Sequence, residues 1–215
     1  MTLSREQIVD AALRILDAEG PDSLSMRRLG AELDAGAASV YWHVGSKDEL
    51  LDLVADRVIG EVLAGIAPTE TWRDWMEGFA RALRRVLLAH RGAAPIVGRR
   101  ATAGPNAMVA LEAVVSLLIR DGFDAPSALL ASTTLVAWTG SLVEGEARES
   151  AADREGAFAA FDRVQVGGPG GAVAAMLPRG AMPTADERFD YGLGVLLEGI
   201  AAREARRRSG ALGPA

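Results

Sequence analysis

An all-α fold is predicted for this chain of 215 residues from three observations. Apolar residues recur at intervals of three and four through most of the chain, which is the spacing of one face of a helix. Several of these stretches open with a Ser or Thr that is followed three residues later by Gln or Glu, a pairing that caps helix N-termini. Examples are Ser4 with Gln7, Ser46 with Glu49 and Thr184 with Glu187. The alternation of apolar and polar residues that would predict a half-buried strand is absent from the sequence.

The composition narrows the class of protein. Apolar residues make up 49% of the chain, which is ample for a sizeable core. Cysteine is absent, which excludes disulfides, a thiolate nucleophile and a zinc knuckle. No signal peptide precedes Ser4, so a soluble cytoplasmic protein is expected. Residues 125–143 carry no charge, but Pro126 and six Ser and Thr residues suit a buried bundle helix better than a lipid span.

The N-terminal third is predicted to hold a helix-turn-helix. A first helix runs from Ser4 to Gly20 and carries an inward stripe that includes Ile8 and Leu16. A second helix carries Leu24, Leu29 and Leu33, and the turn at 34–36 contains Asp and Gly, which tolerate a left-handed backbone. A very short helix over 37–44 follows, and a longer helix starts after Ser46. This order of helix, turn and brief polar helix is typical of DNA-binding motifs.

The string Tyr41-Trp42-His43-Val44, followed by Lys47 and then Leu50-Leu51-Asp52, resembles the recognition region of the TetR family, and of the tetracycline repressors in particular. The close likeness spans residues 5–60, whereas later residues share a helical layout and short strings such as 121–123. The resemblance implies an all-helical homodimer. Its N-terminal domain would bind double-stranded DNA, and its C-terminal domain would bind a small-molecule effector and dimerise.

Carried over position by position, the resemblance implies a DNA-binding face in which Arg27 contacts a base and 39–47 face the groove and its phosphates. A guanidinium suits guanine O6 and N7, and an alanine suits a thymine methyl group. Tetracycline repressors have Gln-Pro where this chain has two alanines, so a different operator is expected. The alternative is that the aromatic residues belong to the core and that Arg27 is a solvated charge. The predicted DNA-binding residues are Arg27, Ala37, Ala38, Ser39, Tyr41, Trp42, His43 and Lys47.

The charge distribution opposes DNA binding at first sight. The chain has a net charge of -6, and residues 1–65 hold all of that excess, with twelve acidic and six basic residues. A DNA-binding domain usually carries a basic face. Residues 24–46 contain two Arg against one Glu and one Asp, and Lys47 is the only lysine in the chain. The local electrostatic field at the motif, rather than the net charge, is therefore expected to decide whether DNA binds, and the non-specific affinity for DNA is expected to be weak.

The rest of the chain is predicted to form a second helical domain. The helix after Ser46 should continue to about Ile66, so domains are expected at 1–66 for DNA binding and 67–215 for ligand binding and dimerisation. Further helices are predicted at 71–90, 96–100, 106–120, 124–148 and 184–208, the third of them with Met108, Leu111 and Ile119 on one side. A short helix within 150–163 and a Gly- and Pro-rich loop over 164–183 complete the prediction.

The resemblance also implies an effector cavity, but its polar residues are replaced here. Three positions that hold the drug and its magnesium in tetracycline repressors align with Leu63, Phe79 and Ile96, and Glu144 alone is a poor magnesium site. We therefore expect no metal, no cofactor and a largely apolar effector. A plain core is the alternative for this apolar set. The predicted ligand-binding residues are Leu63, Trp75, Phe79, Ile96, Met108, Leu111 and Trp138.

No catalytic site is predicted. His90 faces inward and is expected to be a hydrogen-bonded core residue, and no pairing of histidine with carboxylate is suggested by the sequence. Helices 125–143 and 184–208 match the family's four-helix dimer bundle, with Gly192 allowing close approach; both could instead be internal core. The function favoured is a ligand-responsive repressor that binds a palindromic operator. The alternatives are an activator or constitutive DNA binder, a helical enzyme, and a pure dimerisation module.

Overall fold

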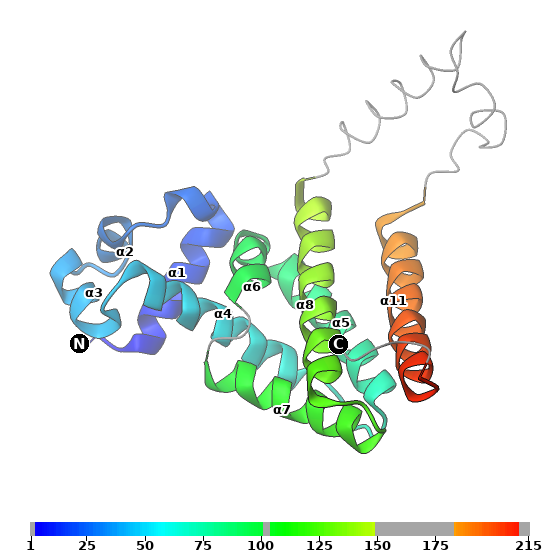
Figure 1. The fold of residues 1–215 in the computed structure, drawn as a ribbon. Helices are drawn as coiled ribbons and strands as arrows, with labels where there is room; N and C mark the ends of the chain where they lie inside the picture. The colour runs from blue at the N-terminus through cyan, green and yellow to red at the C-terminus, as the bar shows by residue number, and fades with distance from the viewer. Residues whose placement is uncertain (1–2, 101–103, 149–182, 211–215) are drawn as a thin grey trace, which may run out of the picture.

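The computed structural model describes residues 3–100, 104–148 and 183–210, and every regular element in these ranges is helical (Figure 1). The predicted all-α fold is confirmed. The short helix predicted within 150–163 and the loop predicted from 164 onward lie outside the described residues, apart from Pro183. Two single turns of 3-10 helix, Pro21–Ser23 and Arg91–Ala93, join longer elements. The α-helices are α1 (Arg5–Glu19), α2 (Met26–Glu32), α3 (Ala37–Val44), α4 (Lys47–Ala64), α5 (Trp72–Ala89), α6 (Ala94–Arg100), α7 (Pro105–Arg120), α8 (Ala125–Arg148) and α11 (Ala185–Arg208).

Helices α1, α2 and α3 pack together as the N-terminal unit, and α1 and α3 pack against α4. Ser4 and Gln7 form the predicted reciprocal cap of α1. The cap of α4 is only half of the predicted box, because Ser46 accepts from the Glu49 amide at 3.0 Å while the Glu49 carboxylate accepts from Arg5 at 3.2 Å. In the turn before α3, Asp34 takes the left-handed backbone with φ of 49°. Gly36 does not, because at φ of -71° it already has the extended N-cap geometry of α3.

Helix α4 joins the two halves, since it packs against α1 and α3 and also against α5, α6 and α7. Its Val54, Val58 and Val62 are fully buried. One carboxylate on it is buried too: Asp56 accepts from the Ala107 amide at 3.0 Å and from the Asn106 side chain at 3.0 Å. The Asp56 carboxylate therefore caps the N-terminus of α7, where the helix dipole favours a carboxylate, and its oxygens have hydrogen-bond donors although the residue is buried.

The C-terminal half is built around α8, which packs against α5, α6 and α7. By length and composition, residues Ala125–Glu146 of this helix could cross a membrane, although a core helix meets the same criterion. The prediction for α7 was partly wrong. Its buried residues are Ala107, Ala110, Val114 and Leu118, whereas Met108 and Ile119 are about half exposed. The small residues Ala107 and Ala110 let α7 approach its neighbours closely, and the larger Met108 and Ile119 lie on the outer side of the helix.

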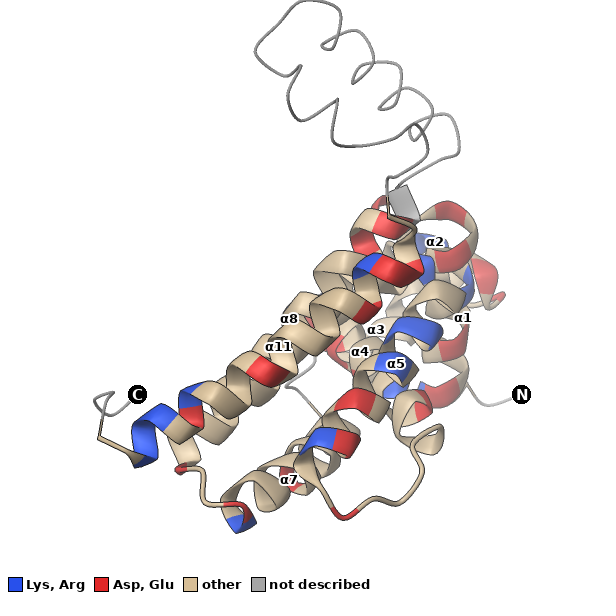
Figure 2. Cartoon of the chain, turned by 90° about the vertical axis from the view of Figure 1, so that its right-hand side faces the viewer, with Lys and Arg blue, Asp and Glu red and all other residues tan. Residues whose placement is uncertain are grey.

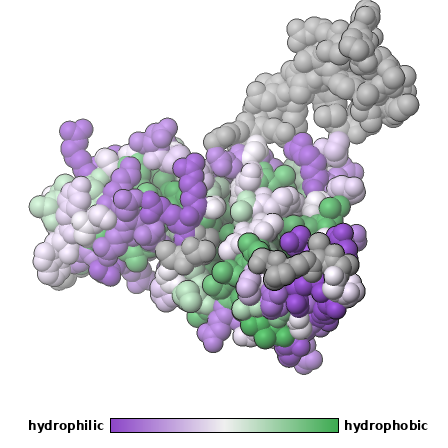
Figure 3. Space-filling model, in the orientation of Figure 1, coloured by the Kyte–Doolittle hydropathy of each residue, from purple (hydrophilic) through white to green (hydrophobic). Residues whose placement is uncertain are grey.

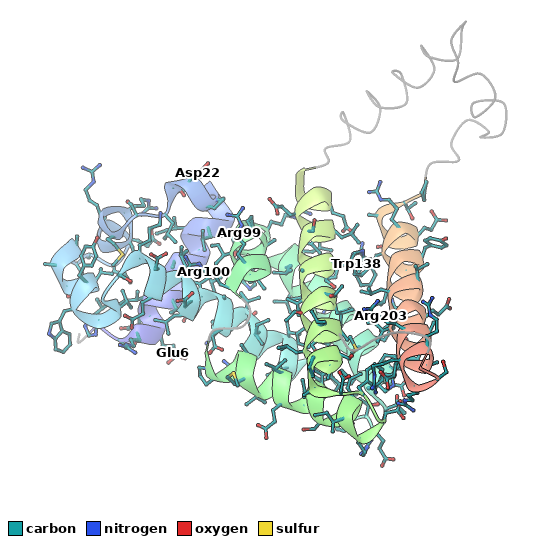
Figure 4. All side chains as sticks on the ribbon, in the orientation of Figure 1. Glu6, Asp22, Arg99, Arg100, Trp138 and Arg203 are labelled. Atoms are coloured by element: carbon teal, nitrogen blue, oxygen red, sulfur yellow. The ribbon has the colours of Figure 1, made fainter. Side chains whose placement is uncertain are left out.

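Helix α11 lies beside α8, and charged residues gather toward the ends of α11 (Figure 2). Trp138 points from α8 toward α11 and stacks on Phe189 with ring centroids 5.5 Å apart (Figure 4). A Cβ at Gly192 would lie 2.5 Å from the Trp138 ring. Gly192 therefore makes room for a side chain of its own subunit, a use that the sequence prediction did not include.

A second contact between the halves lies at the turn Arg91–Ala93, which packs against α1. Gly92 is buried there, and a Cβ on it would lie 1.9 Å from the Leu16 carbonyl oxygen. No side chain fits at that distance. The absence of a Cβ at this position is therefore what allows α1 to dock on the C-terminal half.

Gly92→Ala is expected to lower the free energy of unfolding by about 1–3 kcal/mol, because backbone must move to admit the methyl group. Denaturant unfolding measures this change. Gly98→Ala on α6 is the matched control: its Cβ would meet no atom within 4 Å, so stability should stay unchanged or rise by up to about 1 kcal/mol. Equal effects of the two substitutions would contradict the close docking of α1.

Candidate DNA-binding face and ligand cavity

The recognition helix α3 presents an exposed face. Tyr41 is 48% exposed and Trp42 is 82% exposed, while Val40 and Val44 on the opposite face are fully buried. Trp42 does not pack beneath the helix, and its ring instead meets His43 edge to face at 4.8 Å. The alternative that both aromatic residues belong to the core is therefore wrong. Ser39 and Ala38 are exposed on the same short helix, and Ala37 is half-buried at its first turn.

The basic residues of the N-terminal unit divide into two groups. Arg27 and Lys47 are exposed and form no ion pair with any residue that the structure describes. In contrast, Arg28, the neighbour of Arg27, is bound on both sides, to Glu19 at 2.6 Å and to Glu32 at 3.0 Å. The hydrogen bond from Arg28 holds the pKa of Glu19 below its ordinary value. The two cations left free are the two that the sequence assigned to DNA.

Most of the acidic residues in this unit are already occupied. Ten of the twelve carboxylates in residues 1–65 accept a hydrogen bond or form an ion pair. Arg100 on α6 binds Asp48 at 2.6 Å and Asp52 at 2.7 Å, at the start of α4. Several acids therefore face the C-terminal half, where cations and amides of that half offset their charge. Hydrophilic side chains still gather over the N-terminal unit (Figure 3).

A cavity of about 220 Å³ lies in the C-terminal half among α4, α5, α6, α7 and α8. Its walls are mostly apolar. Trp75 and Phe79 line one side and stack with ring centroids 5.0 Å apart and planes 14° apart. Arg99, Ser132 and Thr133 are its polar lining residues. The remaining lining residues are Ile59, Met76, Gly98, Ala107, Ala110, Leu111, Val114, Leu135, Val136 and Ala137.

The structure separates the predicted ligand-binding residues into two groups. Trp75, Phe79 and Leu111 line the cavity together. The other four lie elsewhere: Leu63 packs half-buried on the core, and Ile96 is buried within it. Met108 faces outward on α7, and Trp138 packs on Phe189 of α11. Leu63 and Ile96 were predicted by alignment with the family's site, whereas Met108 and Trp138 were predicted only as members of the apolar set. The structure turns Met108 to the exposed side of α7 and packs Trp138 on α11.

Arg99 and the hydroxyl pair of α8 were not predicted from the sequence. Arg99 sits at the end of a short helix, where charge alone does not show which way a side chain points. Its neighbour Arg100 binds Asp48 and Asp52 on α4, so adjacent residues of α6 serve the cavity and the N-terminal unit (Figure 4). The only feature of the sequence that indicated a polar site here was the pair Arg99-Arg100 shortly before Gly104-Pro105.

His90 lies between two carboxylates, contrary to the expectation that no histidine and carboxylate would pair. Its Nδ1 is 2.7 Å from Asp17 on α1 and its Nε2 is 3.2 Å from Glu61 on α4. Burial of the ring opposes protonation, but the hydrogen bonds and charges of Asp17 and Glu61 outweigh it and raise the pKa of His90 above its ordinary value. His90 does not line the cavity. It is hydrogen-bonded as predicted, but it is the C-cap residue that follows α5 and it is half-buried rather than part of the core.

Comparison with known families identifies both halves of the chain. Residues 8–54 match the family described as bacterial regulatory proteins, tetR family, and residues 65–204 match the tetracyclin repressor-like C-terminal domain. The chain belongs to the TetR family. Its members are dimeric DNA-binding regulators of transcription, as the resemblance of the recognition region implied.

Individual relatives support the same assignment. An HTH-type transcriptional regulator of Saccharopolyspora erythraea is 43% identical over 62% of this chain and 56% of its own length. The class A tetracycline repressor of Escherichia coli is 31% identical over 94% of this chain and 92% of its own.

Solved structures show the same fold. ActR of Streptomyces coelicolor in complex with actinorhodin is 33% identical, with a TM-score of 0.79 over 94% of this chain and 98% of that one. BioQ with its double-stranded DNA operator is 26% identical, with a TM-score of 0.65 over 93% of this chain and 99% of that one.

The stability that His90 contributes should depend on pH. The charged ring stabilises the folded state fully below the ordinary histidine pKa of about 6.5, and this contribution is lost as the pH rises through the higher folded-state pKa. We expect the difference in free energy of unfolding between the natural protein and His90→Gln to be largest in mild acid and to shrink in mild alkali. Denaturant unfolding across this pH range measures it.

The control for this measurement is His43→Gln, which removes the only other histidine and leaves the contacts of His90 intact. The pH dependence should persist in that variant. A difference that stays constant, or that grows as the pH rises, would show that the protonated ring is not favoured by Asp17 and Glu61.

Proposed function

We propose that the protein is a homodimeric transcriptional repressor that binds a near-palindromic operator and releases it when an effector fills the cavity. Residues 1–66 would bind DNA, and 67–215 would bind the effector and dimerise. Its place of action would be the cytoplasm, and its role would be regulatory rather than catalytic. Supporting this proposal are the operator complex of BioQ, the ligand complex of ActR and the repressors among the relatives.

The observation that carries the proposal is the double role of α6. Its Arg99 and Gly98 line the cavity, and the next residue, Arg100, holds Asp48 and Asp52 in the first two turns of α4. Helix α4 begins three residues after the recognition helix ends. A ligand that displaces α6 would therefore displace α4, and with it the spacing of the two recognition helices in a dimer. Such a ligand must bind the DNA-incompetent state more tightly, with a typical coupling of about 1–3 kcal/mol.

The DNA face would work through a small number of contacts. Arg27 and Lys47 would supply the free cations, and Tyr41, His43 and Trp42 would contact the backbone and groove. Ser39 would face the base edges, and Ala37 or Ala38 would touch a thymine methyl group. Because few cations are free, non-specific affinity should be low and base and shape contacts should matter more.

Two features support dimerisation through α8 and α11. A groove between them is lined by Leu130, Val195 and Ile200, and Leu130 and Val195 are each about half exposed. Apolar residues also stay exposed on the outer faces of the two helices at Leu129 and Tyr191. A second copy would bury these side chains and set two recognition helices about one DNA turn apart.

Selection of bound duplexes from a randomised DNA library, at a stated salt concentration, tests the proposal. A palindrome whose half-sites lie about one helical turn, or 10 base pairs, apart is expected. Arg27→Ala should then weaken binding to that site by about 5- to 150-fold, the loss of one base contact.

Arg57→Ala is the matched control, because it removes the same charge from a residue that is already paired with Glu6, Asp10 and Glu61. It should leave operator affinity nearly unchanged. A library that yields no enriched motif, or equal losses in the two variants, would contradict the proposed DNA-binding face.

A further inference from the structure

The cavity offers an unusual balance of groups. Arg99 is the only charged residue among those that line it. It is an exposed residue, which places it at the opening, and it forms no ion pair with any described part of the chain. The three residues that follow Arg100 are Ala, Thr and Ala, so they add no carboxylate beside it. The described wall therefore presents one uncompensated cation against apolar surface.

The two hydroxyl groups of the cavity do not compete with Arg99 as donors. Ser132 donates to the Ala128 carbonyl at 2.7 Å, and Thr133 donates to the Leu129 carbonyl at 2.9 Å. Both protons are thus used within α8, and only lone pairs remain for a ligand. Arg99 is left as the strong donor, with a planar fork of N–H groups that suits a carboxylate or a similar anion.

The aromatic wall restricts the rest of the ligand. Trp75 and Phe79 are stacked, and both line the cavity together with Leu111 and Val114. Flat aromatic rings pack well against such a surface. A cationic ligand would meet Arg99 with no carboxylate to hold it. A neutral ligand without an acceptor would leave the guanidinium with no partner in the complex, whereas an anion would satisfy both its charge and its donors.

We infer that the effector class is a flat, largely apolar aromatic acid whose anionic group is bound by Arg99 at the cavity opening. This inference rests on the proposed function, and it specifies the ligand of that same cavity. It also gives α6 a direct role: an anion bound to Arg99 acts on the helix whose next residue holds α4.

Two fluorescent probes that share one aromatic skeleton provide the test. 8-Anilinonaphthalene-1-sulfonate carries an anion, and N-phenyl-1-naphthylamine is its neutral counterpart. Binding of both is measured by fluorescence titration to the full chain and to Arg99→Met, which keeps an unbranched apolar side chain. The sulfonate probe should bind the variant about tenfold more weakly or worse, because a charge-assisted hydrogen bond is lost. The neutral probe should change by less than about twofold.

Two further variants control for charge and shape. Arg206→Met removes an equal charge from an exposed position of α11 that does not line the cavity, and it should bind both probes as the natural protein does. Arg99→Lys keeps the charge and should recover part of the affinity for the sulfonate probe. Circular dichroism and denaturant unfolding confirm that each variant is folded.

The outcomes separate this inference from the proposed function. Equal weakening of both probes by Arg99→Met, or no effect on the sulfonate probe, would overturn the choice of an anion while leaving an effector cavity in place. Failure of both probes to bind the natural protein, with operator binding intact, would overturn the effector cavity and this inference together. If the natural protein binds no operator but still prefers the sulfonate probe through Arg99, the proposed repressor function is wrong and the anion preference of the cavity stands.

Discussion

Helix α4 runs through the one hydrophobic core that extends over both halves of the described chain, and the rest of the structure depends on that shared packing. It contacts α1 and α3 on the DNA-binding side and α5, α6 and α7 on the other. Its buried valines belong to this core, and they cannot shift without disturbing the packing of both halves, because protein interiors are close-packed. The buried carboxylate of Asp56, which caps α7, adds a polar connection that would be costly to break. Under the proposed function, a movement of the ligand-binding helices would therefore be transmitted through α4.

The acidic excess of the N-terminal unit has a structural explanation. Several of its carboxylates bind partners on the other half of the chain: Asp48 and Asp52 bind Arg100, while Asp17 and Glu61 flank His90. These contacts hold the DNA-binding unit in one orientation. Arg27 and Lys47, the two cations proposed to contact DNA, are exposed and form no ion pair with any residue that the structure describes. Net charge counted along the sequence therefore misrepresents the field at the recognition helix, which depends on where each charge lies.

Within its seven residues, helix α6 contains both cavity-lining residues, Gly98 and Arg99, and Arg100, which binds the start of α4. It is short, begins right after the turn that contains Gly92, and is packed against α4 and α8. A short helix held by a few specific contacts is easier to displace than a long amphipathic one, since fewer buried side chains must move together. Its neighbour α8 is much longer, and under the proposed function α6 would shift against it.

The sequence by itself determined the helices, their caps and the recognition region. Apolar spacing, Ser and Thr caps and the 41–47 string are local signals, because a helix face and an N-cap are set by residues within four positions of one another. That is why the predicted α3 agrees with the structure at both ends, and why Tyr41 and Arg27 lie exposed as expected. Only the tertiary structure decided which side of α7 is buried and which residues line the cavity. It also decided that His90 meets Asp17 and Glu61, and that Arg99 lines the cavity while Arg100 binds Asp48 and Asp52. Those outcomes depend on the rotation and approach of helices far apart in the chain, which small residues such as Gly92 and Gly192 permit and which no local pattern specifies.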